Sequence, residues 1–505
     1  MRPLLLCVIA SGLVAGCGCK ERIEGTPDST ADGEDVPWDG ECADCDDGNP
    51  CTVDSCDPVS GECTNVPIDA DSDGFASMVA PDGVTACPGN DCDDTDDSVY
   101  PGAPEVCMDG VDQDCDTLVD GPRAMLSTVH LKTVSNGADP SVAWTGSEFA
   151  VAWFEMPDIY MGRVGLDGEL AEDPAQLTDM RWSAHPSIAW TGSMLGLVFY
   201  NNPNHDGCGP DTVDCFSDIH FMQLSSEAEI LGTISTLNDI GTVGLSPEIA
   251  WTGSEFGVFW EDGRDGPCPD SVSCETEIYF THVGMDGLEI GAERRITDTT
   301  GKALLGIAPN ASPVWTGSEY VVAWRQYDSE YIQYLSRLGP EGTLVDEHVM
   351  DSPVEVLTWS GSRFGVTWAD DTSGNYDVYL DFLDPAGVDT GGIVQVTDDG
   401  DGQAFPNMIW TGSTYGVVWL DGRDTGCSPL PYEWMGDCHA QIYMSVLDAE
   451  GTTIWDDVKI TWRDSWKLFT AMAWTGSEFG LAWFEVVADP DAEWYISFDR
   501  ISFCD

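Results

Sequence analysis

The chain has 505 residues, including 54 Gly, 20 Trp and 19 Cys, and a formal net charge of −71. A surface this acidic repels a polyanion, which argues against a nucleic-acid partner. Nineteen cysteines are too many for a reducing cytosol, so we expect an oxidising compartment and disulfide bonds. Residues 21–120 carry 29 Asp and Glu but one basic residue, Arg22. We therefore expect cation binding only where these carboxylates form a local pattern.

The N-terminus has the features of a secretory signal. Arg2 precedes an apolar run, Leu4 to Val14, that is too short to span a membrane. Val14-Ala15-Gly16-Cys17 resembles the bacterial lipobox, which implies removal of residues 1–16 and lipidation of Cys17. Such lipid chains anchor a protein to a membrane surface without spanning it. Gly18 after the lipidated Cys implies an outer-membrane lipoprotein, on the periplasmic side or the cell surface. An ordinary signal peptide cleaved nearby is the alternative.

We expect residues 17–40 and residues 41–68 to differ in whether they adopt a fixed structure. The first segment is acidic, with many Gly and Pro and few apolar groups, and we expect a flexible tether. The second has five Cys between residues 42 and 63, and disulfides must hold it together. The stretch from Cys45 to Cys63 resembles the short extracellular repeat of slime-mould matrix proteins. That resemblance implies a spacer rather than a catalyst; zinc binding by the cysteines is the alternative.

Residues 69–122 carry the clearest metal-binding pattern. Asp69, Asp71 and Asp73 occupy positions 1, 3 and 5 before Gly74, as in the opening of a calcium loop. Three oxygen ligands at this spacing converge on one ion. Position 12, where an EF-hand has Glu, is Ala80. The loop is therefore not a standard EF-hand.

The rest of this segment resembles the metal-binding motif of the MopE type, from Asp91-Cys92-Asp93-Asp94 to Asp120. Cys87, Cys92, Cys107 and Cys115 could form two disulfides in three pairings. The family name is associated with copper, but residues 41–122 contain no His, and carboxylates suit calcium better. We predict a Ca²⁺ site, with a solvated acidic loop as the alternative. The predicted ligands are Asp69, Asp71, Asp73, Asp91, Asp93, Asp94, Asp112, Asp114, Asp116 and Asp120.

A repeated W-x-G element dominates residues 124–505. Successive copies lie 44 to 64 residues apart, a spacing typical of solenoids and propellers. Each repeat reads as four short antiparallel strands, A to D, with a T-G-S-E turn between A and B and a Leu-Thr or Ile-Thr pair at the end of D. The sequence predicts an all-β fold with a seven-bladed β-propeller, leaving six or eight blades open. The Trp residues are Trp144, Trp190, Trp251, Trp315, Trp359, Trp410 and Trp474.

The two ends of the repeat region predict how the ring closes. Val129 to Val134 is an extra strand before the first repeat, and the last repeat reaches strand C at Trp494 to Phe498. We expect the first strand to complete the last blade, which removes exposed sheet edges. Because the repeated Trp recurs at one strand position, we expect it to pack between blades; a sugar-stacking platform is the alternative.

Binding is better sought in the elaborate B–C loops, because stapled loops on a rigid scaffold often carry binding sites. Two of these loops contain a recurring Asp-Gly-Arg-Asp. The functional interpretation is capture of a cation or ligand; the alternative is that this element only shapes the loop. Loop disulfides are predicted between Cys208 and Cys215, Cys268 and Cys274, and Cys427 and Cys438. The predicted partner-binding residues are Asp262, Arg264, Asp265, Asp421, Arg423 and Asp424.

Catalysis has little support in the sequence. No G-x-S-x-G or H-E-x-x-H is present, and the seven His are scattered singly. The order of modules resembles a lipoprotein of the myxobacterial type. We therefore predict a non-catalytic cell-surface lipoprotein that binds calcium through its Asp/Cys-rich module and a protein or glycan through its propeller. The alternatives are a surface polysaccharide hydrolase or lyase and a structural envelope spacer. If Cys17 is lipidated, an odd number of Cys remains after it, and Cys504 is the candidate free thiol.

Overall fold

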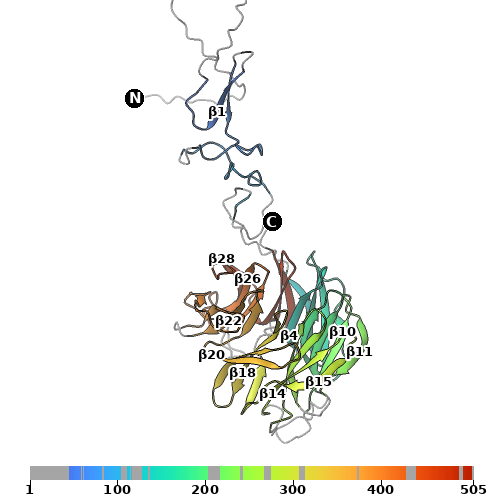
Figure 1. The fold of residues 1–505 in the computed structure, drawn as a ribbon. Coiled ribbons are helices and arrows are strands. Elements are labelled where there is room, and N and C mark those ends of the chain that lie inside the picture. The colour runs from blue at the N-terminus through green and yellow to red at the C-terminus, as the bar shows by residue number, and fades with distance from the viewer. Residues whose placement is uncertain are drawn as a thin grey trace, which may run out of the picture. The chain divides into compact units, whose positions relative to one another are not determined.

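The computed structural model divides into two compact units, residues 1–120 and 121–505 (Figure 1). The predicted signal peptide and tether, Cys17, Cys19 and Cys504 lie outside the described residues. Within those residues, no helix has the length and apolar character needed to cross a membrane. The structure describes residues 45–57, 60, 62–81, 85–103, 111–113, 115, 128–134, 137–202, 216–238, 243–266, 274–305, 313–371, 375–427, 439–487 and 493–502.

The N-terminal unit begins with a short hairpin. Strands β1 (Thr52–Cys56) and β2 (Cys63–Pro67) pair antiparallel, with Thr52 opposite Pro67 and Cys56 opposite Cys63. The chain then continues through loops held by isolated bridges between Ser77 and Asp91 and between Val79 and Ala86. Three disulfides join these pieces, Cys45–Cys63, Cys51–Cys87 and Cys92–Cys115.

The disulfide pattern corrects one expectation. From the sequence we expected Cys87, Cys92, Cys107 and Cys115 to form two disulfides with one another. Cys87 instead bonds to Cys51, which links the β1–β2 hairpin to the loops that follow. Cys92–Cys115 is one of the pairings that the sequence left open. The connectivity differs because a hairpin with little apolar surface is stabilised by a covalent link to its neighbour rather than by its own core.

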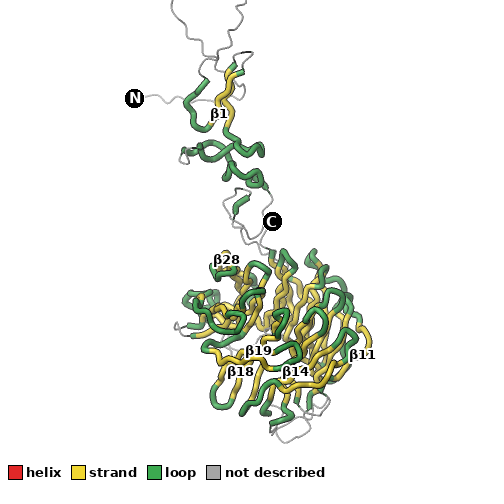
Figure 2. The backbone as a smooth tube through the Cα atoms, viewed as in Figure 1, coloured by secondary structure: helices red, strands yellow, loops and turns green. Residues whose placement is uncertain are grey.

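The C-terminal unit is a seven-bladed β-propeller, as predicted. Seven antiparallel sheets follow one another around the ring, each built from consecutive strands except the last (Figures 1 and 2). Blade 1 has β4 (Gly137–Trp144), β5 (Glu148–Glu155), β6 (Asp158–Gly165) and β7 (Ala175–Gln176), and blade 2 has β8 (Ser183–Trp190), β9 (Leu195–Asn201), β10 (Asp218–Leu224) and β11 (Ile230–Thr236). Blade 3 has β12 (Gly244–Trp251), β13 (Phe256–Asp262), β14 (Glu277–Val283) and β15 (Glu289–Arg295).

Blades 4 to 6 repeat this order. In blade 4 strand A is described as two pieces, β16 (Lys302–Leu305) and β17 (Val314–Trp315), which both pair with β18 (Tyr320–Tyr327). Blade 4 has β16 (Lys302–Leu305), β17 (Val314–Trp315), β18 (Tyr320–Tyr327), β19 (Tyr331–Leu338) and β20 (Leu344–Met350). Blade 5 has β21 (Val356–Trp359), β22 (Phe364–Asp370), β23 (Asp377–Leu383) and β24 (Val394–Gln395), and blade 6 has β25 (Gln403–Trp410), β26 (Thr414–Asp421), β27 (Gln441–Asp448) and β28 (Thr453–Lys459).

Blade 7 combines both ends of the propeller sequence. Strands β29 (Trp466–Trp474), β30 (Phe479–Val487) and β31 (Glu493–Ile501) come from the last repeat. Strand β3 (Val129–Val134) pairs antiparallel with β31, with Val129 opposite Phe498 and Val134 opposite Trp494. The predicted closure by the first strand is therefore confirmed.

Adjacent blades interlock through glycine and an aromatic ring. Near the start of strand B, five blades carry a Gly where an added Cβ would lie 2.4 to 2.7 Å from a ring of the next blade. Only glycine leaves room for the ring at this distance. The last pair, Gly480 with Phe149, joins blade 7 to blade 1. The five pairs are Gly196–Phe256, Gly257–Tyr320, Gly365–Tyr415, Gly416–Phe479 and Gly480–Phe149.

The W-x-G element has two roles in this fold. Its Gly adopts φ between +93° and +110° in all seven A–B turns, a conformation that favours glycine. Its Trp is half-buried in every blade, and in blades 1 to 6 it packs against a hydrophobic cluster shared with the preceding blade. Packing between blades is therefore confirmed for those six Trp residues.

The Leu-Thr and Ile-Thr pairs at the end of strand D also have a physical reason. The Thr hydroxyl accepts a hydrogen bond from the backbone N–H near the start of strand C in the same blade. Thr178 Oγ1 accepts from Ile159 N at 2.9 Å, and Thr297 Oγ1 accepts from Ile278 N at 2.8 Å. Blades 5 and 6 repeat the contact with Thr397 and Thr461. The Thr thus supplies an acceptor for a buried backbone N–H of strand C that is not paired with strand D.

Candidate metal centre and propeller loop bases

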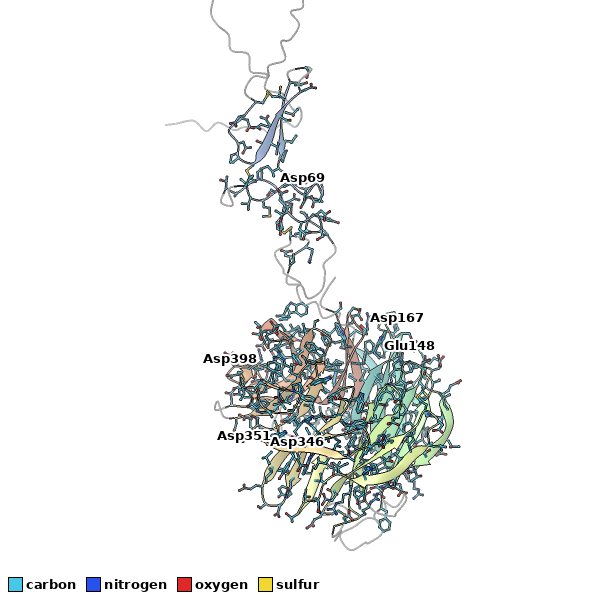
Figure 3. All side chains as sticks on the ribbon, in the orientation of Figure 1. Asp69, Glu148, Asp167, Asp346, Asp351 and Asp398 are labelled. Carbon is cyan, nitrogen blue, oxygen red and sulfur yellow. A yellow bond between two sulfur atoms is a disulfide. The ribbon has the colours of Figure 1, made fainter. Side chains whose placement is uncertain are left out.

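The predicted calcium loop folds as a series of turns stabilised by its own carboxylates. Asp69 Oδ1 accepts from Ser72 N at 2.8 Å, Asp71 Oδ1 from Asp73 N at 3.2 Å, and Asp73 Oδ1 from Phe75 N at 2.7 Å. Gly74, at φ +100°, allows the chain to turn sharply after the third carboxylate. Ligand oxygens of the three Asp residues lie within 4.8 Å of one another. Figure 3 labels Asp69, the first of the three, among the side chains of the N-terminal unit. The spacing thus brings the three together as predicted.

Two carboxylates from the MopE-type segment reach the same place. The bridge between Ser77 and Asp91 sets the two segments side by side, and Met78 N donates to Asp91 O at 2.9 Å. Asp94 Oδ1 accepts from Ala70 N at 2.8 Å, inside the calcium loop. Ligand oxygens of Asp71, Asp91 and Asp94 also lie within 4.8 Å of one another. Asp71 belongs to both groups, so five carboxylates surround one region.

Three of these carboxylates have a second oxygen without a hydrogen-bond partner. Oδ2 of Asp71, of Asp73 and of Asp91 is buried and has no hydrogen-bond partner, while Asp91 as a residue is only 1% exposed. Burial raises the pKa of Asp91 and of Asp71, and the neighbouring carboxylates raise both further. A buried acceptor without a donor is costly, and so are like charges at close range. A cation at this position would relieve both costs.

The other predicted ligands are not in these groups. Asp93 Oδ1 accepts from Thr95 N and from Thr95 Oγ1, at 3.3 and 2.6 Å, so it stabilises a turn instead. Asp112 is described but does not belong to any grouping of metal-ligating residues found in the described part of the chain. Asp114, Asp116 and Asp120 lie outside the described residues.

A further group was not predicted from the sequence. Asp46, Asp47 and Asp54, in the slime-mould-type repeat, have ligand oxygens within 4.8 Å of one another. Asp46 Oδ1 accepts from Gly48 N at 2.7 Å and Asp47 Oδ1 from Asn49 N at 2.8 Å. The sequence Asp46-Asp47-Gly48-Asn49 could have indicated two of its members. The third, Asp54, lies on β1 and comes close to them only in the folded chain. Asp46 and Asp47 are exposed and Asp54 is half-buried.

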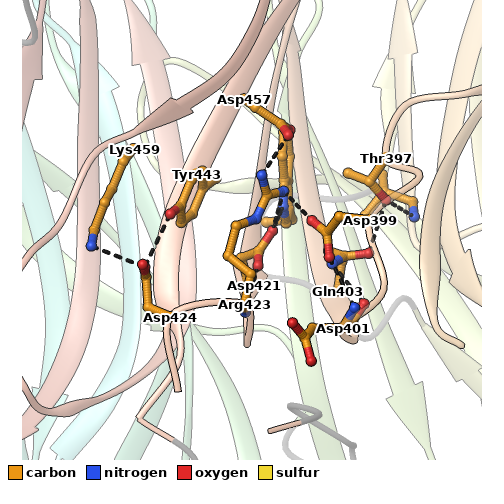
Figure 4. Close-up of polar contacts among 12 residues, drawn as sticks. Thr397, Asp399, Asp401, Gln403, Asp421, Arg423, Asp424, Tyr443, Asp457 and Lys459 are labelled. Atoms are coloured by element: carbon orange, nitrogen blue, oxygen red, sulfur yellow. Dashed lines mark hydrogen bonds and ion pairs between the residues drawn. The ribbon is translucent and has the colours of Figure 1, made fainter. Parts of the chain in front are cut away.

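In blade 6 the Asp-Gly-Arg-Asp element forms one connected network (Figure 4). Asp421 is fully buried and accepts from Trp419 Nε1 at 2.8 Å and from Arg423 at 2.7 Å. The Arg423 guanidinium also pairs with Asp457 and Asp399, each at 2.5 Å, and lies 4.4 Å from the centre of the Tyr443 ring. Asp424 pairs with Lys459 at 2.9 Å.

Blade 3 builds the same network at the base of its own B–C loop. Asp262 is fully buried and accepts from Trp260 Nε1 at 2.8 Å and from Arg264 at 2.6 Å. Burial raises the pKa of Asp262, but its hydrogen bonds from Arg264 and Trp260 outweigh this and hold the pKa below its ordinary value. Arg264 also pairs with Glu293 at 2.5 Å and lies 4.1 Å from the centre of the Tyr279 ring. Tyr279 donates to Asp265.

The two networks place all six predicted partner-binding residues together, three in each blade. Their charged atoms contact residues of the same blade and of the loop that leads in from the preceding blade, where Asp399 and Asn238 lie. These contacts are what the loop-shaping alternative requires; binding by the six residues stays a prediction. Cys274 and Cys427 are each disulfide-bonded. Their predicted partners, Cys268 and Cys438, and both Cys208 and Cys215 lie outside the described residues.

Comparisons with known proteins identify two segments of the N-terminal unit. A family model described as "Putative metal-binding motif" matches residues 91–120, and the Dictyostelium (slime mold) repeat matches residues 44–68. Both matches agree with the resemblances seen in the sequence, and neither reaches the propeller. No curated protein matches the chain.

Several solved structures are similar to the chain at low identity. One is an acylaminoacyl peptidase of Pyrococcus horikoshii, with 13% identity over 73% of this chain and 52% of that chain and a TM-score of 0.42. Another is a sialidase of Trypanosoma rangeli in complex with sialic acid, with 10% identity, 75% and 58% coverage and a TM-score of 0.42. An α-L-arabinanase of Penicillium chrysogenum complexed with arabinobiose has 10% identity, 76% and 99% coverage and a TM-score of 0.38. The chain spans little more than half the length of the first two proteins.

Proposed function

We propose that the protein is a calcium-stabilised, non-catalytic lipoprotein of the cell surface, whose propeller binds a protein or glycan. The observation that carries the calcium part is the set of buried, partnerless Oδ2 atoms of Asp71, Asp73 and Asp91. Asp69 and Asp94 would complete the ligand set. Ca²⁺ takes about six to eight oxygen ligands and tolerates irregular geometry, which suits a site built from loops.

Copper fits this site poorly. Copper binds imidazole or sulfur ligands, whereas the ligand atoms here are carboxylate oxygens. Seven cysteines of the N-terminal unit, at positions 45, 51, 56, 63, 87, 92 and 115, are disulfide-bonded and offer no thiolate. We therefore assign a hard divalent cation to the site and propose Ca²⁺.

Calorimetric titration of the mature chain with Ca²⁺, Mg²⁺ and Cu²⁺ tests this assignment. We expect Ca²⁺ to bind more tightly than Mg²⁺, and Asp71→Asn to weaken Ca²⁺ binding at least tenfold, because Asp71 belongs to both carboxylate groups. Asp96→Asn is the matched control, since Asp96 contacts Ser98 within its own turn. Tight Cu²⁺ binding that survives Asp71→Asn, or no heat with Ca²⁺, would refute the proposal.

The membrane anchor rests on the lipobox-like Val14 to Cys17. Metabolic labelling with a palmitate analogue should mark the wild-type protein in the membrane fraction, and Cys17→Ala should abolish the label. Protease accessibility on intact cells then separates the cell surface from the periplasmic side. A label that persists in the Cys17→Ala variant would contradict lipidation at this residue.

For the propeller, the supporting observation is that two blades fix the bases of their B–C loops with the same Asp–Arg–Tyr–Asp network. We propose that partner binding occurs at this face, around Asp262, Arg264, Asp265 and the corresponding residues of blade 6. A glycan array and cross-linking in envelope extract would identify the partner, and Asp265→Asn with Asp424→Asn should weaken its capture. Turnover in a polysaccharide-degradation screen would instead favour the hydrolase or lyase alternative.

A further inference from the structure

Arg463, in the loop between β28 and β29, differs from most arginines of the propeller in what neutralises it. Its guanidinium is exposed, and no carboxylate of the described residues forms an ion pair with it. It donates instead to His130 Nε2 at 2.9 Å and lies 5.3 Å from the centre of the Tyr495 ring. Six other arginines pair with Asp or Glu at 2.5 to 2.7 Å, namely Arg163, Arg264, Arg295, Arg337, Arg423 and Arg500.

The loop that carries Arg463 is fixed by buried polar contacts. Lys467 Nζ, on β29, donates to the Arg463 carbonyl oxygen at 2.8 Å and to Ser465 Oγ at 2.9 Å. Ser465 Oγ donates in turn to Glu485 Oε1, on β30, at 2.5 Å. Lys467, Ser465 and Glu485 are all buried. The loop therefore presents Arg463 and its neighbours in one conformation, which lowers the entropic cost of binding a ligand.

The Arg463 side chain is positioned by hydrogen bonds that cross blade 7. Because a guanidinium only donates, His130 Nε2 accepts from it and His130 Nδ1 donates to Ser497 Oγ at 3.0 Å. Ser497 Oγ then donates to Glu485 Oε2 at 2.9 Å. Partial burial lowers the pKa of His130, and Arg463 lowers it further against the opposing effect of Glu485. The imidazole is thus neutral, so it orients Arg463 without adding to or cancelling its charge.

Aromatic side chains accompany this guanidinium. Tyr495, on β31, stacks on His130 with ring centroids 4.5 Å apart. Trp462 immediately precedes Arg463 and is 53% exposed. Among the described residues it is the one tryptophan that ranks as exposed, whereas the repeated Trp residues of the blades are half-buried. Its indole offers a flat apolar face to a ring-shaped ligand.

The charges near Arg463 limit the ligand to a monoanion. Glu493 accepts from the Tyr495 hydroxyl, and Asp464 pairs with His439. A phosphate dianion or a polyanion would be repelled by these carboxylates and by the net charge of −71. A single carboxylate balances one guanidinium and matches its paired N–H donors. Together with the exposed indole, this favours a ligand that combines one carboxylate with the apolar face of a ring.

We propose that the loop between β28 and β29 binds a carboxylated sugar, with Arg463 pairing its carboxylate and Trp462 stacking on its ring. This inference rests on the proposed function in taking a glycan as the partner, and it adds the class of glycan. It uses none of the six partner-binding residues of blades 3 and 6. The two sites can therefore be tested separately.

Titration of the mature full-length chain with cellobiouronic acid and with cellobiose tests the site, because the two disaccharides differ in one carboxylate. We expect the acid to bind at least tenfold more tightly. Arg463→Gln should reduce the affinity for the acid to that for cellobiose, and Trp462→Leu should weaken both. Arg294→Gln is the matched control, since Arg294 is an exposed arginine on β15 of blade 3, and it should leave both affinities unchanged.

The exposure of Arg463 and Trp462 makes these variants compatible with the fold, which circular dichroism checks. Equal affinities for the two disaccharides, or binding of the acid that survives Arg463→Gln, would overturn the proposal. Tighter binding of benzoate than of cellobiouronic acid would overturn the assignment to a sugar. Binding that is lost in Asp265→Asn with Asp424→Asn but kept in Arg463→Gln would overturn this inference and leave the proposed partner-binding face intact. The reverse result would support the Arg463 site and count against that face.

Discussion

The two units of this chain reach a folded state by different means. In the described part of the N-terminal unit the buried hydrophobic residues are Cys51, Ile68, Ala80, Val99 and Ala103, too few to form a substantial core. Disulfides join the segments of that unit instead, and several of its carboxylates converge. In the described part of the propeller, six interfaces between blades are filled by hydrophobic clusters that include large aromatic side chains. One unit therefore depends on covalent bonds and, under the function proposed above, on a cation, and the other depends on packing.

The largest expected effect breaks the packing of the propeller. Gly480→Leu would place a side chain where even a Cβ lies 2.4 Å from the Phe149 ring, at the joint between blades 7 and 1. We expect a loss of about 3 kcal/mol or more in the free energy of unfolding, because neither backbone nor ring can yield. Denaturant unfolding monitored by circular dichroism measures it.

Gly400→Leu is the control for this substitution, since Gly400 has open space around the position of a Cβ and no positive φ. It should change the stability by less than about 0.5 kcal/mol. If both variants unfold at the same denaturant concentration as the wild type, the Gly–aromatic interlock does not hold the ring together.

The next effect concerns the other unit. Removing Ca²⁺ with a chelator should destabilise the N-terminal unit by about 3 kcal/mol when the ion had been present at a hundred times its dissociation constant. The propeller transition should not move, because the acidic groups around Asp71 belong to residues 69–94. Calorimetric scans with and without chelator resolve the two transitions. A shift of the propeller transition alone would contradict the assignment.

The sequence predicted most of the propeller because its signals are local and repeated. The W-x-G turns and the closing strand Val129–Val134 are properties of short segments. The Gly480–Phe149 contact is different, since its partners lie more than three hundred residues apart and only closure of the ring brings them together.

The N-terminal unit shows the same distinction between local sequence signals and contacts that only the fold brings about. Asp69, Asp71 and Asp73 were found because their spacing is local, and Asp91 and Asp94 because of a known motif. The Cys51–Cys87 bond was not predicted, because cysteine spacing does not determine connectivity. Asp54 joined Asp46 and Asp47 only through the course of the chain around β1.

A smaller effect is expected from removing a threonine hydroxyl that accepts a hydrogen bond from the backbone of its own blade. Thr178→Val keeps the shape of the side chain but leaves Ile159 N, buried at 2.9 Å from Thr178 Oγ1, without an acceptor. We expect a loss of about 1 to 2 kcal/mol in propeller stability. Thr425→Val, at an exposed Thr, serves as the comparison and should have little effect. Equal losses would show that the hydroxyl contact is not what stabilises strand C.

The smallest expected effect, a difference in pH dependence, distinguishes the two units most directly. Burial raises the pKa of Glu261, which is 5% exposed, to about 7, and that of Asp499, which is 1% exposed, also to about 7. A carboxyl whose pKa is higher in the folded state stabilises that state at low pH. This contribution is lost as the pH rises from about 4 through 7. The propeller should therefore be more stable at pH 5 than at pH 8.

The N-terminal unit should respond in the opposite sense when Ca²⁺ is present. Burial and like charges raise the pKa of Asp71 and Asp91, so protons compete with the cation at low pH. Its Ca²⁺-dependent stability should thus increase from pH 5 to pH 8, where the propeller loses stability. Scanning calorimetry at both pH values gives the two transitions in one experiment, and Glu261→Gln should flatten the propeller's dependence alone. Transitions that move in the same direction would mean that buried carboxyls and cation binding do not set the difference between the units.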